Sequence, residues 1–395
     1  MTVEVKGTAV PFTPHLTDVV MYRDFASGNE KDLRIGNFFW KEEVMARIRG
    51  KAKKAEIMTL EEAVKKYMRD GIQIAFSGFT AFNRNPMAFA WEAVRQGFKD
   101  LHVIDRHGSA CTWLLNTVGA IKIYETDWMG WGEMAGKLDI NMERLYKTQK
   151  IMLEDYSHGA MAMRFLAGAI GAPFIPYYAP MGSDLYNPDY DAMGKAGLRT
   201  GKNPRIAKKK FIQIEEPFFG DGEVILLPAA RPELAIIHVS QVGDKGTARW
   251  RGIGTIDKEI AFACDKVVIT AEEVVPEAEM RKEPEANQIP FFTVDAIVEV
   301  PWGAFPSGVP FYYDYDAPFM REMDKASRNP EDLKKWLDEW VFAPKHWEDF
   351  IIKLGAQKLL SLKADSTTGY STKMMRGKNP APRMKMPLSV ARSGY

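Results

Sequence analysis

From Met58 onward, helical and strand-like hydrophobic patterns alternate along the chain. The segment TLEEAVKKYMRD places its apolar residues on one helical face, and Thr59 with Glu62 three residues later forms a capping box that predicts the helix start. The run GIQIAFSGFT predicts a buried strand that ends in a tight Ser-Gly loop. PMAFAWEAVRQG predicts a second helix, with Pro86 in its first turn and Gly97 at its C-terminus.

The same strand-then-loop pattern recurs further along the chain. It is found in LHVIDRHGSA, PFIPYYAPMGSDL, EVILLPAA, LAIIHVSQVGDKGTARW, KVVITAEEVV and AIVEVPWGAF. Apolar strands that alternate with helices and glycine-bearing loops predict an α/β fold: an open, mainly parallel sheet with helices on both faces. Ligands of such sheets bind at the carboxyl ends of the strands, where these loops are expected.

The composition divides the chain into three segments. Residues 1–57 mix charge, glycine and aromatic residues without a sustained period and are predicted to be an N-terminal extension. Residues 58–362 are predicted to form the α/β domain. Residues 363–395 are polar, basic and rich in Pro and Gly, which predicts a C-terminal tail with little core of its own.

Charge and cysteine content narrow the class of protein. The 53 basic and 52 acidic residues nearly balance, which argues against a general attraction to nucleic acid or an acidic membrane. The opening MTVEVKGTAVPFTPHL does not resemble a secretory signal, and no apolar stretch reaches the roughly 18–20 residues that span a bilayer. Cys111 and Cys264 make neither a disulfide framework nor a metal motif. We therefore expect a cytoplasmic protein that binds neither nucleic acid nor membrane.

The loop formed by Ser77, Gly78, Phe79 and Thr80 is the first candidate site. A glycine after a strand lets the backbone approach a ligand closely, and the amide groups of a loop beside a helix start suit a phosphate or an oxyanion. An ordinary strand-to-helix turn explains the same pattern. Neither GxGxxG nor GxxxxGK[ST] occurs, so neither common nucleotide site is predicted.

Further candidates follow other apolar runs. The glycine-loop pattern recurs at Gly108 and Ser109 and at Gly182 and Ser183, which suggests one shared cleft. Arg84 and Asn85 precede the second helix, where an arginine can pair with a carboxylate or a phosphate or simply be solvated. The Lys208–Lys210 run predicts a solvated face, or a contact with the phosphates of a ligand.

Glu154 is the candidate catalytic carboxylate. It follows an apolar run, and a half-buried glutamate at a strand end can have a raised pKa and act as base or nucleophile. A structural ion pair is the alternative. Glu272 is expected to cap a helix, and His238 to be a core residue, whereas His107 beside Gly108 is better placed for a cleft. HExxH, His/Cys clusters and GxSxG are all missing, so no metal site is predicted.

The order of these motifs resembles a known family. TLEEAVKKYMRDGIQIAFSGFT, MLEDYSHG, GAPFIPYYAPMGSDL, ELAIIHVSQVGDKGTAR, VDAIVEVPWGAFPSG and EWVFAPKHWEDFIIKLG are similar, in co-linear order, to the large subunit of the glutaconate CoA-transferases, in the class I CoA-transferase family. The resemblance covers residues 58–362.

The resemblance implies a two-chain enzyme that acts on acyl-CoA and a carboxylic acid and binds no cofactor. The smaller chain would carry a nucleophilic glutamate that forms a mixed anhydride and then an enzyme-CoA thioester, in a hetero-oligomer of α2β2 type or larger. In this chain the resemblance implies that the Ser77–Thr80 loop lines the shared site, with Ser109, Gly182 and Ser183 nearby.

Two departures from the family pattern keep other functions open. Ser77 replaces the first glycine of Gly-Gly-Phe, and Phe305 replaces the histidine of Gly-Ala-His-Pro, which favours a bulkier, more apolar acyl group. Some relatives resemble ring-opening hydrolases of cyclic diketo acyl-CoA thioesters, for which Glu154 would be the catalytic carboxylate. The further alternative is a scaffold chain without catalytic residues.

Overall fold

The computed structural model describes residues 33–35, 38–40, 55–130, 139–178, 182–220 and 222–371. The chain divides into two compact units, Met1–Ala52 and Lys53–Tyr395. In the first unit, the described residues form an antiparallel pair of β1 (Leu33–Ile35) and β2 (Phe38–Trp40). The rest of the predicted N-terminal extension up to residue 54 lies outside the described residues. All other described elements belong to the second unit.

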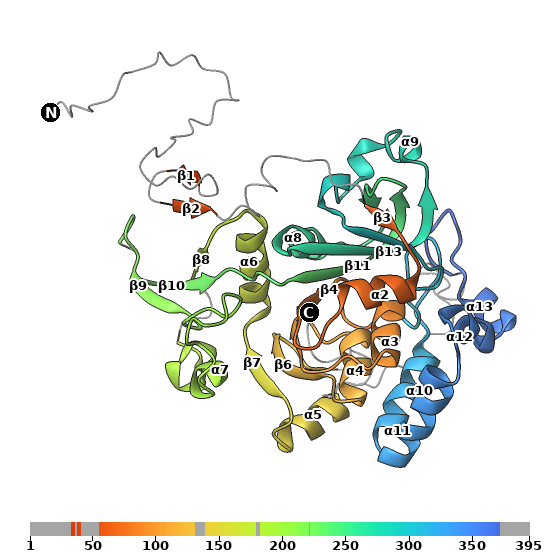
Figure 1. Cartoon of the computed structure of the whole chain (residues 1–395), viewed down its shortest axis with the longest axis horizontal. Coiled ribbons are helices and arrows are strands. Elements are labelled where there is room, and N and C mark those ends of the chain that lie inside the picture. The colour runs from red at the N-terminus through yellow and green to blue at the C-terminus, as the bar shows by residue number, and fades with distance from the viewer. Residues whose placement is uncertain are drawn as a thin grey trace, which may run out of the picture. The chain divides into compact units, whose positions relative to one another are not determined.

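A nine-stranded sheet forms the centre of the second unit (Figure 1). Its strands are β3 (Glu56–Ile57), β4 (Gln73–Phe76), β5 (Leu101–Ile104), β6 (Ile121–Thr126), β7 (Met152–Asp155), β11 (Leu234–Gly243), β12 (Ala248–Arg249), β13 (Lys266–Val275) and β14 (Ala296–Glu299). The order is β3-β14-β13-β11-β4-β5-β6-β7, and every neighbouring pair in it is parallel. The short β12 pairs antiparallel with β11. The predicted open, mainly parallel sheet is confirmed.

Helices cover both faces of this sheet. One hydrophobic cluster joins the sheet to α2 (Leu60–Tyr67), α3 (Met87–Arg95), α4 (Ala110–Thr117), α10 (Ala317–Ser327) and α11 (Pro330–Leu337). A second joins it to α6 (His158–Ala169) and α8 (Asp257–Ala263). In β4, Ile74 and Phe76 belong to the first cluster and Ala75 to the second, as the two-residue period of a strand requires. Both cysteines are buried, Cys111 in the first cluster and Cys264 in the second.

The other described α-helices are α5 (Ile140–Lys147), α7 (Ala192–Lys195), α9 (Glu277–Met280), α12 (Trp347–Leu354) and α13 (Ala356–Leu362). Single 3-10 turns cover Asp184–Tyr186, Pro188–Tyr190, Pro284–Ala286 and Phe291–Thr293, and a π turn covers Asp338–Phe342. No described helix has the length and apolar character that crossing a bilayer requires.

A separate antiparallel sheet contains β8 (Phe174–Tyr177), β9 (Ile212–Glu215) and β10 (Glu223–Pro228), in the order β8-β10-β9. Two apolar runs that resembled main-sheet strands therefore lie outside that sheet. The exposure of β8 alternates along the strand instead of being low throughout, which is the pattern of an antiparallel strand with one solvated face. Figure 1 shows this sheet beside α6, apart from the parallel strands.

The local signals at the domain start are confirmed. The Thr59 hydroxyl accepts the amide of Glu62 at 3.2 Å, and the Glu62 carboxylate accepts the amide of Thr59 at 2.9 Å. Gly97 ends α3 with a φ of 80°, a conformation that glycine adopts without strain. At the other end, the amide of Ser371 donates to Asp314 at 2.6 Å. Residues 372–395 of the predicted tail lie outside the described residues.

Candidate active site

The strand order places a topological switch point between β4 and β11. From β4 the chain adds β5, β6 and β7 on one side, and from β11 it adds β13 and β14 on the other. Open α/β sheets bind ligands outside the carboxyl ends of their strands at such a point. The Ser77–Thr80 loop directly follows β4, so it lies where the site was expected from the sequence.

The polar groups at the start of this loop are bound within the protein. The amide of Gly78 donates to Asp257 Oδ1 at 3.1 Å, and the amide of Phe79 donates to the carbonyl of Asn83 at 2.9 Å. The Ser77 hydroxyl accepts the amide of His238 at 2.9 Å. These groups stabilise the loop. They are not free to bind an oxyanion, which was the expectation from the sequence.

Arg84 and Asn85 also support the loop from inside, so the expectation that they meet a ligand anion is wrong. Arg84 is fully buried, pairs with Asp257 at 2.5 Å and lies 4.7 Å from the ring of Trp250. Asn85 donates to the carbonyl of Thr80 at 2.8 Å and accepts the amide of Ala110 at 2.7 Å. A buried guanidinium needs a close anion, and Asp257 supplies it.

Unusual backbone conformations gather around this loop. Gly78 has a φ of 115°, and a Cβ there would lie 2.6 Å from Asn85 Nδ2 and 2.8 Å from the carbonyl of Asn83. Thr80, Arg84 and His107 also have positive φ values, of 51°, 50° and 78°. Left-handed backbone is unfavourable for residues other than glycine and concentrates at functional sites.

The other two glycine loops lie in different places. Ser109 caps α4, its hydroxyl accepting the amide of Thr112 at 3.2 Å, and a Cβ on Gly108 would lie 2.5 Å from the carbonyl of Gly130. The contact between Asn85 and Ala110 brings this loop beside the first one. Gly182 and Ser183 instead follow β8, in the small antiparallel sheet.

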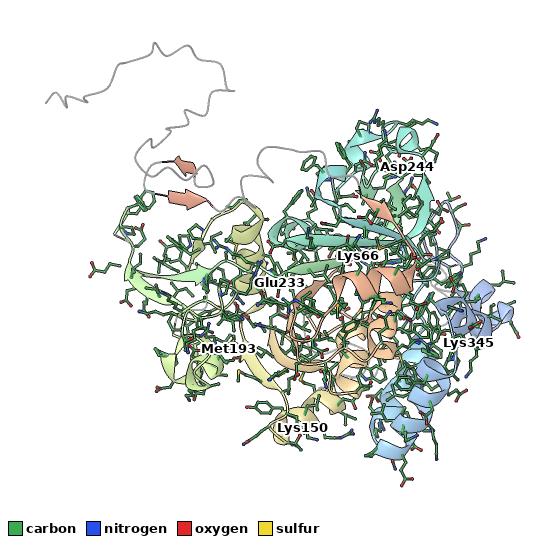
Figure 2. The ribbon with its side chains drawn as sticks, viewed as in Figure 1. Lys66, Lys150, Met193, Glu233, Asp244 and Lys345 are labelled. Atoms are coloured by element: carbon green, nitrogen blue, oxygen red, sulfur yellow. The ribbon has the colours of Figure 1, made fainter. Side chains whose placement is uncertain are left out.

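Glu154, the candidate catalytic residue, lies near the end of β7 as expected but is enclosed by cations. Its side chain is fully buried, with Oε1 2.8 Å from Nζ of Lys210 and Oε2 3.2 Å from Nη2 of Arg199. The amide of Met193 in α7 donates to Oε2 at 2.9 Å, and Figure 2 labels Met193 in the α7 region. Burial raises the pKa of Glu154, and Lys210, Met193 and Arg199 offset part of that shift.

These contacts bear on two expectations from the sequence, the solvated face that includes Lys210 and the ion pair of Glu154. Lys210 is buried and not part of a solvated face, because its ammonium neutralises Glu154. The geometry supports the alternative in which Glu154 is one half of a structural ion pair.

Two other strand glutamates are partnered in the same way. Glu125 on β6 lies 2.8 Å from both His102 Nε2 and Arg164 Nη2. Burial opposes its ionisation, but Arg164 and His102 outweigh burial and hold the pKa of Glu125 well below its usual range. Glu272 lies inside β13 and pairs with His238 Nε2 at 2.8 Å. The expected helix-cap role for Glu272 is therefore wrong, whereas His238 is fully buried, as expected.

Another polar cluster at this edge consists of His107, Asp127 and His158, and no lysine or arginine of the described residues lies within ion-pair distance of Asp127. His107 follows β5, Asp127 follows β6 and His158 begins α6. Oδ1 of Asp127 lies 3.7 Å from Nδ1 of His107, and Oδ2 lies 3.3 Å from Nδ1 of His158. The two imidazole centres are 4.2 Å apart, and the Phe79 ring lies 5.3 Å from that of His107. The cluster therefore adjoins the loop after β4.

Burial controls the charge of this cluster. It lowers the pKa of His107 to about 3, with further contributions from His158 and Arg106. It raises the pKa of Asp127 to about 6, which backbone hydrogen bonding and Arg106 partly oppose. Burial and the nearby Asp127 also raise the pKa of Asp105 well above its usual range. His107 is therefore a neutral imidazole at neutral pH, available as a proton acceptor or a ligand.

His107 was expected near a cleft from its sequence, whereas Asp127 and His158 were missed. The three residues come from separate strand ends, and their spacing depends on the sheet order. The available signal was weak: each follows a short apolar run by only a few residues.

A comparison with known sequences identifies the family. Residues 57–300, more than half of the chain, match the coenzyme A transferase family. The chain belongs to the coenzyme A transferase family. It is 33% identical over 322 residues to one subunit of the glutaconate CoA-transferase of Acidaminococcus fermentans, covering 82% of this chain and 99% of that one. The crystal structure of that enzyme covers 81% of this chain and 99% of its own, with a TM-score of 0.73.

Two further relatives of this CoA-transferase family chain carry different activities. It is 30% identical to one subunit of the 3-oxoadipate CoA-transferase of Pseudomonas knackmussii, over 77% of this chain and all of the relative. It is 27% identical to the cholesterol ring-cleaving hydrolase IpdA subunit of Mycobacterium tuberculosis, over 68% of this chain and 87% of the relative.

Phe305, one of the two departures from the family pattern, is a core residue in this CoA-transferase chain. It is fully buried, with its ring 5.0 Å from Phe319 and 5.9 Å from Phe350. Its side chain therefore packs against helices and gives no support to the expectation of a bulkier acyl group.

Proposed function

We propose that this chain is the larger subunit of a two-chain CoA-transferase that moves CoA between carboxylic acids. Two relatives that it matches over 99% and 100% of their length each bear the name of one subunit within a CoA-transferase. We further propose that it works in the cytoplasm with a smaller α/β chain, as a hetero-oligomer of α2β2 type or larger. No cofactor takes part in this reaction.

The observation that carries the proposal is the state of the three buried glutamates on the strands of the parallel sheet. A carboxylate nucleophile must be ionised and able to reach the thioester carbonyl. Glu125, Glu154 and Glu272 are all buried, and each is paired with a buried cation or histidine. None of the three can approach a substrate without breaking that pairing, which favours a nucleophile from the partner chain.

The proposed reaction balances without any other reactant. The partner's glutamate carboxylate attacks the acyl-CoA carbonyl and displaces the CoA thiolate, giving a mixed anhydride. The thiolate then attacks the glutamyl carbonyl, which releases the first acid and leaves an enzyme-CoA thioester. A second carboxylate takes up the CoA through the reverse of these steps. This chain would supply the wall around the switch point, with the Ser77–Thr80 loop facing the thioester.

The decisive experiment combines the chain with its smaller partner and follows both by mass spectrometry. After incubation with acyl-CoA, we expect a CoA adduct on a glutamate of the partner that borohydride reduces, and no turnover by this chain alone. Turnover by the purified single chain would contradict the proposal.

Glu154→Gln separates transfer from ring-opening hydrolysis. We expect the transferase to lose roughly tenfold in rate or less, whereas loss of a general base costs roughly 10²–10⁴-fold. The assay is run under conditions in which the variant remains folded. An inactive Glu154→Gln enzyme together with no adduct on the partner would favour the hydrolase.

A further inference from the structure

Three side chains lie close together at the carboxyl edge of the parallel sheet. The ring nitrogens of His107 and His158 and the carboxylate of Asp127 provide one donor atom each, all within 4.8 Å of one another. Each residue comes from a different segment, so the convergence is a property of the fold. We infer that these three residues bind one divalent transition-metal cation of the Zn²⁺ class.

The donors are held in place by the backbone around them. The amide of His107 donates to Asp127 Oδ1 at 2.9 Å, which fixes the loop after β5 against the loop after β6. His158 is the first residue of α6, whose N-cap Ser157 accepts the amide of Ala160 at 3.2 Å. A metal site needs ligands in fixed positions, and these contacts provide them.

Two buried donor atoms in the cluster have no hydrogen-bond partner among the described residues. They are Nε2 of His107 and Oδ2 of Asp127. His107 is 5% exposed and the Asp127 side chain is fully buried, so bulk water reaches neither atom freely. Most buried polar atoms in folded proteins are satisfied, so an unsatisfied imidazole nitrogen and an unsatisfied carboxylate oxygen in one cluster indicate a site for a ligand.

The neighbouring charges are compatible with a bound cation. Asp105 follows β5 two residues before His107, and its Oδ2 is also buried without a hydrogen-bond partner in the described ranges. Arg106 contributes positive charge nearby, but no hydrogen bond joins it to Asp127 in the described part of the chain. Among the described residues, Asp127 therefore has no ion pair with a lysine or arginine like those that Glu154 forms with Lys210 and Arg199.

The donor set indicates which cations fit. Two imidazoles and one carboxylate suit borderline ions such as Zn²⁺, whereas Mg²⁺ and Ca²⁺ prefer oxygen ligands throughout. Three protein ligands leave a coordination position for water or for a carboxylate or carbonyl oxygen. The His158 side chain is 49% exposed, so one side of the cluster is open to solvent.

Sequence motifs do not predict this site. Metal motifs are recognised when ligands lie a few residues apart on one helix or knuckle. Here residues 107, 127 and 158 are brought together by the parallel order of β5, β6 and β7. The inference goes beyond CoA transfer and does not depend on it, because its test reads out metal binding.

The test uses the full chain, with its partner if the chain needs one to stay in solution. The protein is stripped of metal and titrated with Zn²⁺ in a calorimeter. We expect one ion per chain and no competition from Mg²⁺. His158→Ala should weaken binding by at least about tenfold, since even changing a neighbour of a ligand costs roughly 10–100-fold. Co²⁺ should give a ligand-field spectrum that His158→Ala alters.

His346→Ala is the matched control, because His346 is also a partly solvated histidine at a helix start, that of α12. It should bind Zn²⁺ as the wild type does. Asp127→Asn provides a second variant, whose folding is checked by circular dichroism. The inference is overturned if the wild type binds no Zn²⁺, if His158→Ala and Asp127→Asn both bind it as the wild type does, or if His346→Ala loses it equally.

Discussion

Two buried carboxylates on neighbouring strands of this protein have opposite surroundings. Glu154 on β7 faces Lys210 and Arg199 at 2.8 and 3.2 Å. Asp127, just after β6, faces two histidines at 3.3 and 3.7 Å. Both side chains are fully removed from solvent. Burial is thus the same in the two places, and the difference lies in the partners.

The difference separates a structural carboxylate from one available to a ligand. Lysine and arginine carry their charge at all physiological pH values, so Glu154 is neutralised within the fold. Histidine at neutral pH offers Asp127 no fixed positive charge. A carboxylate with permanent cations contributes to stability and resists exchange of partners, whereas one beside neutral imidazoles can accept a proton or a cation.

The strongest test of the comparison removes a cation from the cluster of Glu154, Lys210 and Arg199. Lys210→Met leaves the buried Glu154 short of its nearest counter-ion, and losing one partner of a buried ion pair costs about 3–5 kcal/mol. The free energy of unfolding from urea titration measures the loss. Lys209→Met, at the exposed neighbouring position, should change stability by no more than about 0.5 kcal/mol. Equal effects of the two variants would show that the pairing is unimportant.

A carboxylate-to-amide change in both clusters gives a matched pair. Glu154→Gln should cost about 2–4 kcal/mol, because buried Lys210 loses its nearest anion and Arg199 keeps only Asp191, while the amide oxygen still accepts from Met193. In metal-free protein, Asp127→Asn should stay within about 1 kcal/mol of the wild type, since its oxygen still accepts the His107 amide. Urea titration at one pH compares them. A larger loss for Asp127→Asn would reverse the assignment of the two clusters.

Sequence patterns predicted the fold because the relevant signals are local. The capping box of Thr59 and Glu62 and the apolar runs report short-range geometry, and the family resemblance supplied the order of the elements. Glu154 was correctly placed at a strand end, but its cations were not foreseen. Arg199 and Lys210 lie in the segment between α7 and β9, and contacts so distant in sequence follow no fixed spacing.

The candidate site was less predictable for the same reason. The loop after β4 was located from its glycine, but the internal bonds of Arg84 and Asn85 depend on Asp257 and Ala110, in other elements. His107 was singled out by its neighbouring glycine. Asp127 has no such local mark, because its role depends on which strand lies beside β6.

A substitution at Gly78 tests the rigidity of the Ser77–Thr80 loop, which lies beside the cluster of His107, Asp127 and His158. Gly78→Ala places a Cβ against Asn85 and Asn83, and such overpacking costs roughly 1–3 kcal/mol beyond the backbone effect. Gly71→Ala is the control, because Gly71 also has a positive φ, of 71°, but no atom lies within 4 Å of its added Cβ. The difference between their unfolding free energies isolates the clash. Equal free energies of unfolding would mean that the loop shifts to accommodate the Cβ, and that glycine is needed there for a ligand.

The smallest expected effect concerns Asp139, a buried carboxylate between the two extremes. It caps α5 and accepts from the amide of Asn141 at 2.9 Å and from Asn116 Nδ2 at 3.3 Å. These partners are neutral, and burial raises the pKa of Asp139 to about 6 although they oppose the shift. If neutral hydrogen-bond donors stabilised a buried carboxylate as well as a cation does, the pKa of Asp139 would not be raised.

A folded-state pKa above the unfolded one means that the folded protein holds the proton more tightly. The contribution of Asp139 to stability is therefore complete below the unfolded pKa and falls as pH rises through about 6. Asn resembles the protonated form and is as good an N-cap. We expect the free energy of unfolding of Asp139→Asn, relative to that of the wild type, to rise by about 1 kcal/mol from pH 5 to pH 7. Urea titration at each pH measures it. A constant difference between the two proteins across this range would show that Asp139 is ionised throughout and that neutral partners suffice to hold a buried charge in this fold.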